Sequence, residues 1–166
     1  PKYPLDIRDQ SKLLVYQNLE IKEDLFCNIA EHLPKETMLI FNDSKVIPVR
    51  LFFETAESKL VEVFCLEPYQ ELGSNKAIWK CFVGRAKKWK EKTLSQTKGK
   101  HTIEVELVSK EKDYSLVQFT WSQSLASIYD LFQFFGAIPI PPYLKRESET
   151  IDTERYQNVF ANHKGS

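Results

Sequence analysis

The sequence has few cysteines and histidines, and neither type is grouped. Cys27, Cys65 and Cys81 are odd in number and lack the close spacing of a zinc site. This argues against a disulfide framework and favours a reducing, cytoplasmic compartment. GxSxG, P-loop and GxGxxG motifs are missing from the sequence, so no complete catalytic set is visible. We therefore expect no metal site and no prosthetic group.

Long apolar runs and an excess of one charge are also missing. No stretch approaches the roughly 18 apolar residues that a membrane helix needs, and no signal-peptide pattern opens the chain. We therefore expect a soluble protein without a membrane partner. Basic and acidic residues balance at 23 each, which excludes a globally basic nucleic-acid binder but permits a local basic patch.

The first 50 residues have the mixed periodicity of an α/β fold. Residues 11–17 predict a short buried strand, and residues 23–33 predict an amphipathic helix that Pro34 ends. The compact apolar run TMLIFND, at residues 37–43, predicts a second buried strand that ends in a polar loop.

From about residue 50 the apolar period changes to two. Five short runs alternate apolar and polar side chains with turn residues between them, at residues 50–56, 59–67, 77–84, 101–109 and 115–121. This pattern predicts an antiparallel meander or small barrel over residues 51–121. Cys65 and Cys81 fall on the apolar faces of their runs, which indicates core residues and not metal ligands.

A helix and a proline-rich connector follow the predicted barrel. Residues 122–136 carry an apolar stripe at helical spacing. Ser122 or Ser124 can cap the start of this helix, and Gly136 suits a left-handed residue after its end. The connector GAIPIPPYLKRE then runs to Glu147 with three prolines within four positions. Because proline fixes φ and has no amide donor, we expect a stiff, extended connector.

These patterns predict an α+β, multidomain organisation, in which an antiparallel β-barrel is inserted into an α/β domain. Residues 1–50 would form the first segment of the main domain, and residues 51–136 the inserted barrel with its closing helix. Residues 137–166 would return to the main domain; we call them the return segment. The chain begins at Pro1 without an initiator methionine and ends in a polar tail, so we expect a truncated piece of a longer protein.

A polar loop after the predicted strand at 37–43 is a candidate binding site. Asn42, Asp43 and Lys45 stand where α/β folds usually place ligand-contacting residues. Arg50 adds a cation suited to a carboxylate or a phosphate. A polar turn, in which Asn and Asp bond their own backbone, explains the same residues, and both readings stay open.

The segment GRAKKWKEK, residues 84–92, is a second candidate; we call it the basic loop. Around Trp89 it carries the cations Arg85, Lys87, Lys88, Lys90 and Lys92. Cations around an exposed aromatic ring suit a nucleic-acid backbone with a stacked base. A solvated hairpin loop is the alternative.

Four blocks follow one another along nearly the whole chain: YPLDIRDQSKLLV, LIFNDSKVIPVRLF, GAIPIPPYLKRE and ERYQNVFA. Their sequence and order resemble the S-adenosylmethionine:tRNA ribosyltransferase-isomerase family of queuosine biosynthesis. The resemblance implies a transferase that moves and isomerises the ribosyl part of S-adenosylmethionine onto the 7-aminomethyl-7-deazaguanine base of tRNA. The product would be epoxyqueuosine, and the partners would be that tRNA and S-adenosylmethionine, a co-substrate. We expect a monomer, and no activity from this piece alone.

The resemblance also assigns roles to the candidate residues. Asp43 becomes the candidate catalytic residue, near the sulfonium or the amine. The substrate- and cofactor-binding candidates are Arg8, Asn42, Lys45, Arg50, Tyr143 and Lys145. The tRNA-binding candidates are Arg85, Lys87, Lys88, Trp89 and Lys90. For Arg8 and Arg50, an ion pair across the domain junction is the alternative role.

A non-catalytic RNA-binding barrel module is the alternative function, because short strands and a basic loop are typical of such modules. It leaves the α/β-like opening and the proline-rich connector unexplained. A plain protein-interaction domain explains neither of these, nor the basic loop.

Overall fold

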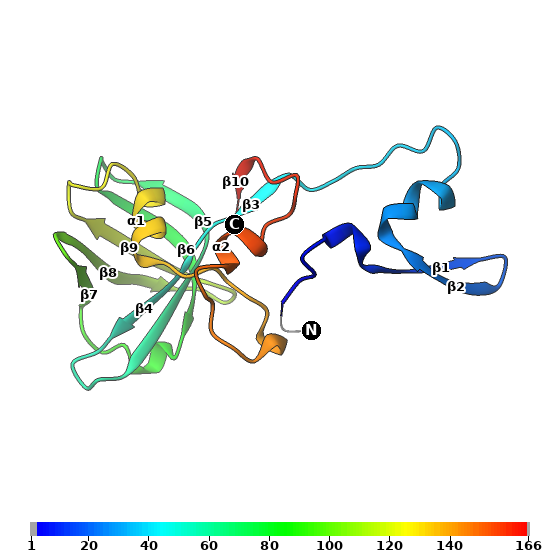
Figure 1. Cartoon of the computed structure of the whole chain (residues 1–166). Coiled ribbons are helices and arrows are strands. Elements are labelled where there is room, and N and C mark those ends of the chain that lie inside the picture. Colours follow the sequence, from blue (N-terminus) through cyan, green and yellow to red (C-terminus); the bar gives the residue numbers. More distant parts are fainter. Residues whose placement is uncertain (1–2, 166) are drawn as a thin grey trace.

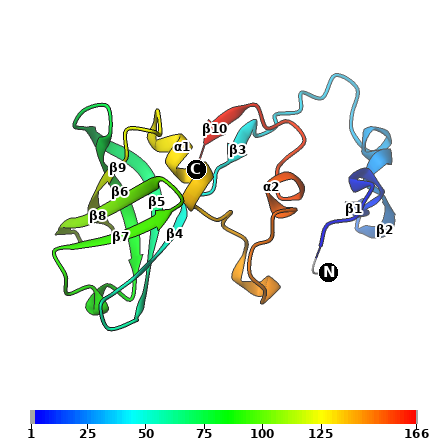
Figure 2. The same ribbon diagram turned by 60° about the vertical axis from the view of Figure 1, so that its left-hand side comes forward.

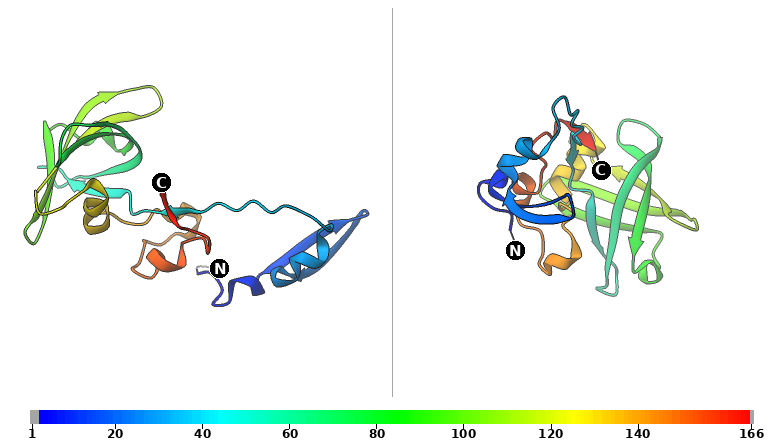
Figure 3. Two further views of the ribbon diagram at one scale, coloured as in Figure 1. Left: turned by 90° about the horizontal axis from the view of Figure 1, so that it is seen from above. Right: turned by 90° about the vertical axis from the view of Figure 1, so that its right-hand side faces the viewer.

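The structure, a computed structural model, describes residues 3–165 and has three parts (Figure 1). A barrel packed against helix α1 (Ile128–Phe135) forms one end of the molecule. A hairpin of β1 (Lys12–Gln17) and β2 (Glu20–Leu25) forms the other end. The return segment lies between them, and an extended stretch of chain joins the hairpin to the barrel, as the left view of Figure 3 shows.

Six antiparallel strands build the barrel in the order β4-β5-β6-β9-β8-β7. Their bounds are β4 (Arg50–Glu54), β5 (Leu60–Glu71), β6 (Lys76–Gly84), β7 (Thr93–Lys98), β8 (His101–Lys110) and β9 (Ser115–Trp121). The outer strands β4 and β7 also contact one another, so the sheet nearly closes on itself (Figure 2). The antiparallel barrel is therefore confirmed.

Strand β7 is a sixth strand that the sequence analysis missed. Its sequence, TLSQTK, is polar, and Leu94 is its one hydrophobic residue, buried in the core. A strand at the end of a sheet needs only one inward-facing apolar side chain when its backbone is paired, here with β8. The alternation is therefore too weak to be recognised from the sequence.

Alternate residues of the barrel strands point into one hydrophobic core. The fully buried ones include Leu51, Phe53, Val61, Val63, Ile103, Val105, Val117 and Phe119. Burying such a side chain stabilises the fold by roughly 1.5–3 kcal/mol relative to leaving it exposed. Cys65 and Cys81 lie opposite one another on β5 and β6 and are confirmed as core residues. Burial raises the pKa of the Cys65 thiol, which keeps it protonated.

Helix α1 covers the barrel with the apolar stripe that the sequence predicted. Its side chains Leu131 and Phe132 are fully buried, and the ring of Phe132 meets that of Trp79 edge to face at 5.1 Å. The helix is shorter than expected, because its cap is Ser127, whose hydroxyl accepts from the amide of Asp130.

The two expected caps have other partners, so that prediction was wrong. The hydroxyl of Ser122 accepts from the amide of Thr102, and that of Ser124 contacts the ring of His101 at 2.7 Å. Both serines therefore hold the residues before α1 against β8, and Ser127 caps the helix.

The N-terminal part differs most from the prediction. Residues 12–17 do form a strand, but none of them is fully buried, and among residues 3–165 it pairs with β2 alone. A turn with positive φ at Asn18 and Leu19 joins the two strands, which is the turn that suits a two-residue hairpin. In place of an α-helix over 23–33, the chain has the end of β2 and the 3₁₀ helix η2 (Phe26–His32).

The buried strand expected at residues 37–43 is absent. These residues form no strand and are exposed, with Met38 and Ile40 at 84% and 89% exposure. A buried strand needs neighbouring strands and a covering layer, and no strand among residues 3–165 pairs with this run. The strand β3 (Ser44–Val46) begins only after this run.

The connector is in no helix from Gly136 to Pro141 and then makes one 3₁₀ turn, η4 (Pro142–Leu144), so it is not extended throughout. Helix α2 (Asp152–Arg155) and strand β10 (His163–Gly165) follow, and β10 pairs in parallel with β3. Two further 3₁₀ turns are η1 (Arg8–Gln10) and η3 (Ala86–Lys88). Among residues 3–165, no helix has the length and apolar character needed to cross a bilayer.

The chain enters and leaves the barrel at one crossing, where Pro48 and Arg50 lie against Gly136 and Ala137. The amide of Ala137 donates to the carbonyl of Arg50 at 2.8 Å, and the amide of Arg50 donates back at 3.3 Å. Gly136 is extended, with φ of −82° and ψ of 165°, so the left-handed conformation expected there was wrong. Glycine is needed for another reason, because a Cβ would lie 1.7 Å from the carbonyl oxygen of Pro48.

Gly136→Ala should therefore destabilise the protein through this steric contact alone, because alanine adopts a φ of −82° as easily as glycine does. Pushing the two backbones apart should lower the free energy of unfolding by at least about 2 kcal/mol, measured by urea denaturation. Gly84→Ala is the control: its Cβ would come no closer than 3.2 Å, to the Cβ of Glu62. Equal stability of the two variants would contradict a rigid crossing.

Candidate functional site

A cleft of about 550 Å³ lies between the outer face of the barrel and the return segment. We call it the barrel–return cleft. Its lining consists of Arg50, Phe52, Leu60, Glu62, Gly84, Arg85, Ala137, Arg146, Glu147 and Ser148. Strand alternation creates one wall: because Leu51 and Phe53 point into the core, Arg50 and Phe52 must point outward, into the cleft.

Arg50 is held in this cleft by its neighbours on the sheet. Its Nε donates to Oε1 of Glu62 at 2.5 Å, and its guanidinium lies 5.3 Å from the centre of the Phe52 ring. Within residues 3–165, the two terminal nitrogens of Arg50 have no hydrogen-bond partner. The ion-pair role of Arg50 is therefore present, but it uses one edge of the guanidinium and leaves the other edge open to the cleft.

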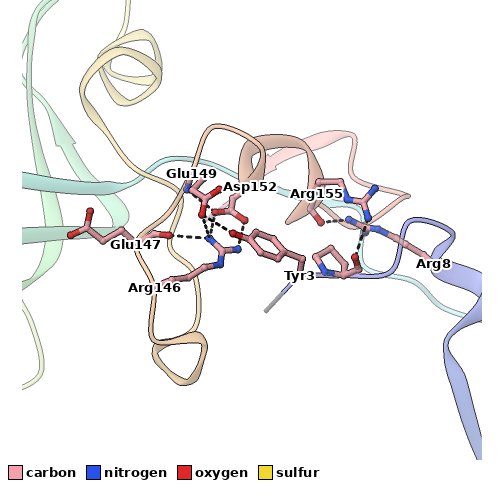
Figure 4. Close-up of polar contacts among 8 residues, drawn as sticks. Tyr3, Arg8, Arg146, Glu147, Glu149, Asp152 and Arg155 are labelled. Carbon is pink, nitrogen blue, oxygen red and sulfur yellow. Dashed lines mark hydrogen bonds and ion pairs between the residues drawn. The ribbon is translucent and has the colours of Figure 1, made fainter. Parts of the chain in front are cut away.

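On the opposite side of the cleft, Arg146 forms a buried ion pair with Asp152 (Figure 4). The two bonds measure 2.6 and 2.7 Å, Asp152 is fully buried, and the ring of Tyr3 lies 4.5 Å from the guanidinium. The amide of Glu149 also donates to Asp152. The hydrogen bonds from Arg146 lower the pKa of the Asp152 carboxyl, and the same bonds raise the pKa of Arg146.

This ion pair has no signal in the sequence. Arg146 was visible only as a cation at the end of the connector, and Asp152 stood in a polar stretch with no apolar period. The pair becomes recognisable only when the turn between residues 147 and 151 brings the side chains together.

A second hollow, of about 430 Å³, lies where the N-terminal residues meet the return segment, and it brings the predicted residues Arg8 and Tyr143 together. Arg8 donates to the carbonyl of Arg155 (Figure 4) and to that of Gln157. Arg155 donates to the carbonyls of Pro4 and Leu5. Arg8 thus crosses the junction, as its alternative role required, but it binds carbonyls and not a carboxylate.

The tyrosines in this hollow differ in their surroundings. Tyr143 is 76% exposed, whereas Tyr156 is half-buried. Burial, together with a hydrogen bond to Tyr143, raises the pKa of Tyr156. Lys145 follows with a φ of +50° and is exposed, and it has no polar partner within residues 3–165.

The loop with Asn42 and Asp43 has the features of a polar turn. Oδ1 of Asn42 accepts from the amide of Ser44 at 2.7 Å, and Oδ2 of Asp43 contacts Nδ1 of His163 at 2.8 Å. Both side chains are exposed, as is Lys45. None of the three lines the barrel–return cleft. The structure therefore supports the turn, and it does not bring Asp43 to Arg50.

The basic loop keeps its cations at the surface but not its tryptophan. Lys87 and Lys88 are exposed on η3, and Lys90 pairs with Glu57 at 3.1 Å. Trp89 is only 7% exposed and belongs to the barrel core, so the expectation of an exposed ring for base stacking was wrong. The short turn η3 directs this one side chain inward.

No metal site is assembled in the part of the chain that the structure describes, where no three His, Cys, Asp or Glu side chains come together. All three cysteines are free; Cys27 is exposed.

Asp152→Asn should loosen the return segment. The substitution removes the buried counter-charge of Arg146, and breaking a buried pair costs about 3 kcal/mol. Hydrogen exchange at the amides of α2 should become faster by the factor that corresponds to this loss of free energy. Glu149→Gln is the matched control: it removes the charge of the exposed partner, 3.9 Å from Arg146, and keeps an oxygen that can accept from the hydroxyl of Tyr3.

The same pair predicts a pH dependence. Because folding lowers the pKa of Asp152, its stabilisation is present above the ordinary value of 3.8 and is lost as the pH falls through the lowered pKa. The acid-induced acceleration of exchange in α2 should therefore disappear in Asp152→Asn. Protection that is identical in the variant and the parent at all pH values would contradict the role of this pair.

Comparison with known proteins identifies the family. The model of the queuosine biosynthesis protein family matches residues 1–166. Curated proteins named S-adenosylmethionine:tRNA ribosyltransferase-isomerase are similar to 99% of the chain, with 35% identity for the proteins of Trichlorobacter lovleyi and Chlorobium chlorochromatii and 34% for that of Aquifex aeolicus. The chain covers 46%, 46% and 47% of these three relatives. The chain thus belongs to the queuosine biosynthesis protein family and spans about half the length of the curated relatives it matches.

Proposed function

We propose that this chain is part of an S-adenosylmethionine:tRNA ribosyltransferase-isomerase. The observation that carries the proposal is the match to the family from the first residue to the last, together with relatives of that name at 35% identity. The enzyme would transfer and isomerise the ribosyl group of S-adenosylmethionine onto the 7-aminomethyl-7-deazaguanine base of tRNA. Adenine and methionine would leave, and epoxyqueuosine would form in the tRNA.

The geometry supports separate places for the two substrates. The surface cations of the basic loop suit the phosphates of tRNA, which require charge more than exact placement. Arg50 in the barrel–return cleft, and Arg8 with Tyr143 in the second hollow, lie in concave sites of the size that small molecules use. We assign these three residues to substrate binding. We assign the same role to Asn42, Lys45 and Lys145, which are exposed residues of the segments before and after the barrel.

Asp43 is the proposed acid–base residue. The aminomethyl group of the base must lose a proton before it attacks the ribosyl carbon, and a carboxylate can accept that proton or hold the amine in place. The exposed position of Asp43, with His163 as its side-chain partner, leaves one carboxylate oxygen free for a substrate. We further propose that the enzyme acts in the cytoplasm as a monomer; the three free thiols support a reducing compartment.

In the complete enzyme, Asp43→Ala should lower turnover by about 100-fold, the loss typical of a general acid–base group. The free energy of unfolding should change by less than about 0.5 kcal/mol, because the carboxylate is exposed. Adenine release from S-adenosylmethionine and precursor tRNA measures turnover. The control is Asp113→Ala, an exposed aspartate on the β8–β9 turn, and the 166-residue chain alone should release no adenine. Equal losses of turnover and stability in Asp43→Ala would instead indicate a turn-forming role.

The basic loop should contribute a salt-dependent part of tRNA binding. The double variant Lys87→Glu and Lys88→Glu removes two cations from the exposed turn η3. The slope of log affinity against log salt should become shallower by roughly 1.4, since each phosphate contact on a single strand contributes about 0.7. The matched control reverses two exposed lysines: Lys110, the last residue of β8, and Lys112, on the β8–β9 turn. Identical slopes for the two double variants would exclude the basic loop from the interface.

A further inference from the structure

The barrel–return cleft presents carboxylates as well as cations, unlike a site built for phosphate. Glu62 and Glu147 line it together with Arg50, Arg85 and Arg146. Arg146 is neutralised by the buried carboxylate of Asp152, so its charge is already balanced within the protein. What remains for a ligand is one open edge of Arg50, the exposed Arg85 and two carboxylates.

The carboxylate of Glu62 is kept accessible by the strand opposite it. Gly84 on β6 pairs directly with Glu62 on β5. A Cβ at Gly84 would lie 3.2 Å from the Cβ of Glu62 and 3.5 Å from its Oε2. Because Oε1 is occupied by Arg50, it is this second oxygen that faces the open space left by the glycine. Glu147, on the return segment, is exposed and has no side-chain partner among residues 3–165.

Charges of both signs side by side fit a zwitterion better than a polyanion. A phosphodiester backbone would meet two carboxylates here and be repelled by them. An α-amino acid, in contrast, has a carboxylate for the free edge of Arg50 and an ammonium group for a glutamate. Phe52 and Leu60 supply apolar surface for its methylene carbons.

We propose that the barrel–return cleft binds the methionyl part of S-adenosylmethionine. The α-carboxylate is held by the terminal nitrogens of Arg50, the ammonium lies near Glu62, and the sulfonium lies near Glu147. This inference rests on the proposed function and assigns the co-substrate to the barrel–return cleft. A cleft of about 550 Å³ is within the range of roughly 300–1,000 Å³ that small-molecule sites occupy.

Calorimetric titration of the 166-residue chain with S-adenosylmethionine and with S-adenosylhomocysteine tests the inference. The second compound has the same amino-acid group but lacks the sulfonium charge, so it should bind at least about fivefold more weakly if glutamates face that charge. Equal affinity for the two compounds, or no binding of S-adenosylmethionine at millimolar concentration, would overturn the proposal.

Variants then locate the site. Arg50→Met should weaken S-adenosylmethionine binding by about 10- to 100-fold, the value expected for losing a charge-assisted bond to a carboxylate. Glu147→Gln should weaken it about threefold while sparing S-adenosylhomocysteine, and it touches no structural contact. Lys110→Met, at the exposed end of β8, is the control and should leave both affinities unchanged. Circular dichroism checks that each variant is folded.

Two outcomes separate this inference from the function on which it rests. If the complete enzyme carrying Arg50→Met releases adenine with an unchanged KM for S-adenosylmethionine, the cleft assignment fails and the proposed function stands. If the parent enzyme releases no adenine with precursor tRNA, the proposed function fails, even where titration finds the co-substrate in the cleft. A loss of anticodon stem-loop binding, and not of S-adenosylmethionine binding, in Arg50→Met would make the cleft an RNA site and overturn the assignment.

Discussion

The crossing of two backbones at Pro48 and Gly136 is the constraint on which the rest of this structure depends. The chain enters the barrel through β4 and leaves it after α1, and both ends of the excursion are hydrogen-bonded to each other through Arg50 and Ala137. The carbonyl of Pro48 occupies the space in which any other residue at 136 would place its Cβ. Because the two ends of the barrel segment are held together in this way, the direction in which the return segment leaves the barrel is fixed.

The barrel–return cleft is a consequence of that direction. The crossing fixes Arg50 at the start of β4, facing outward because Leu51 points into the core. It also places the return segment beside the same face of the sheet. There the buried ion pair of Arg146 with Asp152 stabilises the turn that lines the other side of the cleft (Figure 4). The residues that line the cleft therefore come from both the barrel and the return segment.

The same return brings distant parts of the chain together outside the barrel. Tyr3 contacts Arg146, Arg8 binds the carbonyls near residue 156, and β3 pairs with β10. These contacts are mostly polar and involve single side chains or short strands, so they leave apolar residues such as Met38 and Ile40 uncovered. The barrel is where hydrophobic burial stabilises this chain, and the junction is where specific hydrogen bonds position it.

The sequence by itself determined five of the six barrel strands and the helix that covers them, because apolar residues repeat there with periods of 2 and 3.6. It left a meander and a closed barrel as alternatives. It also indicated Arg50 and the basic loop as candidates from residue type. Only the tertiary structure decided which strands pair, that Trp89 turns inward and that Asp43 lies away from the cleft. It also decided that residues 37–43 stay exposed, since a strand forms only where a partner backbone is present. The ion pair of Arg146 with Asp152 has no local signal, because it depends on the path of the chain between two side chains and not on a repeating pattern.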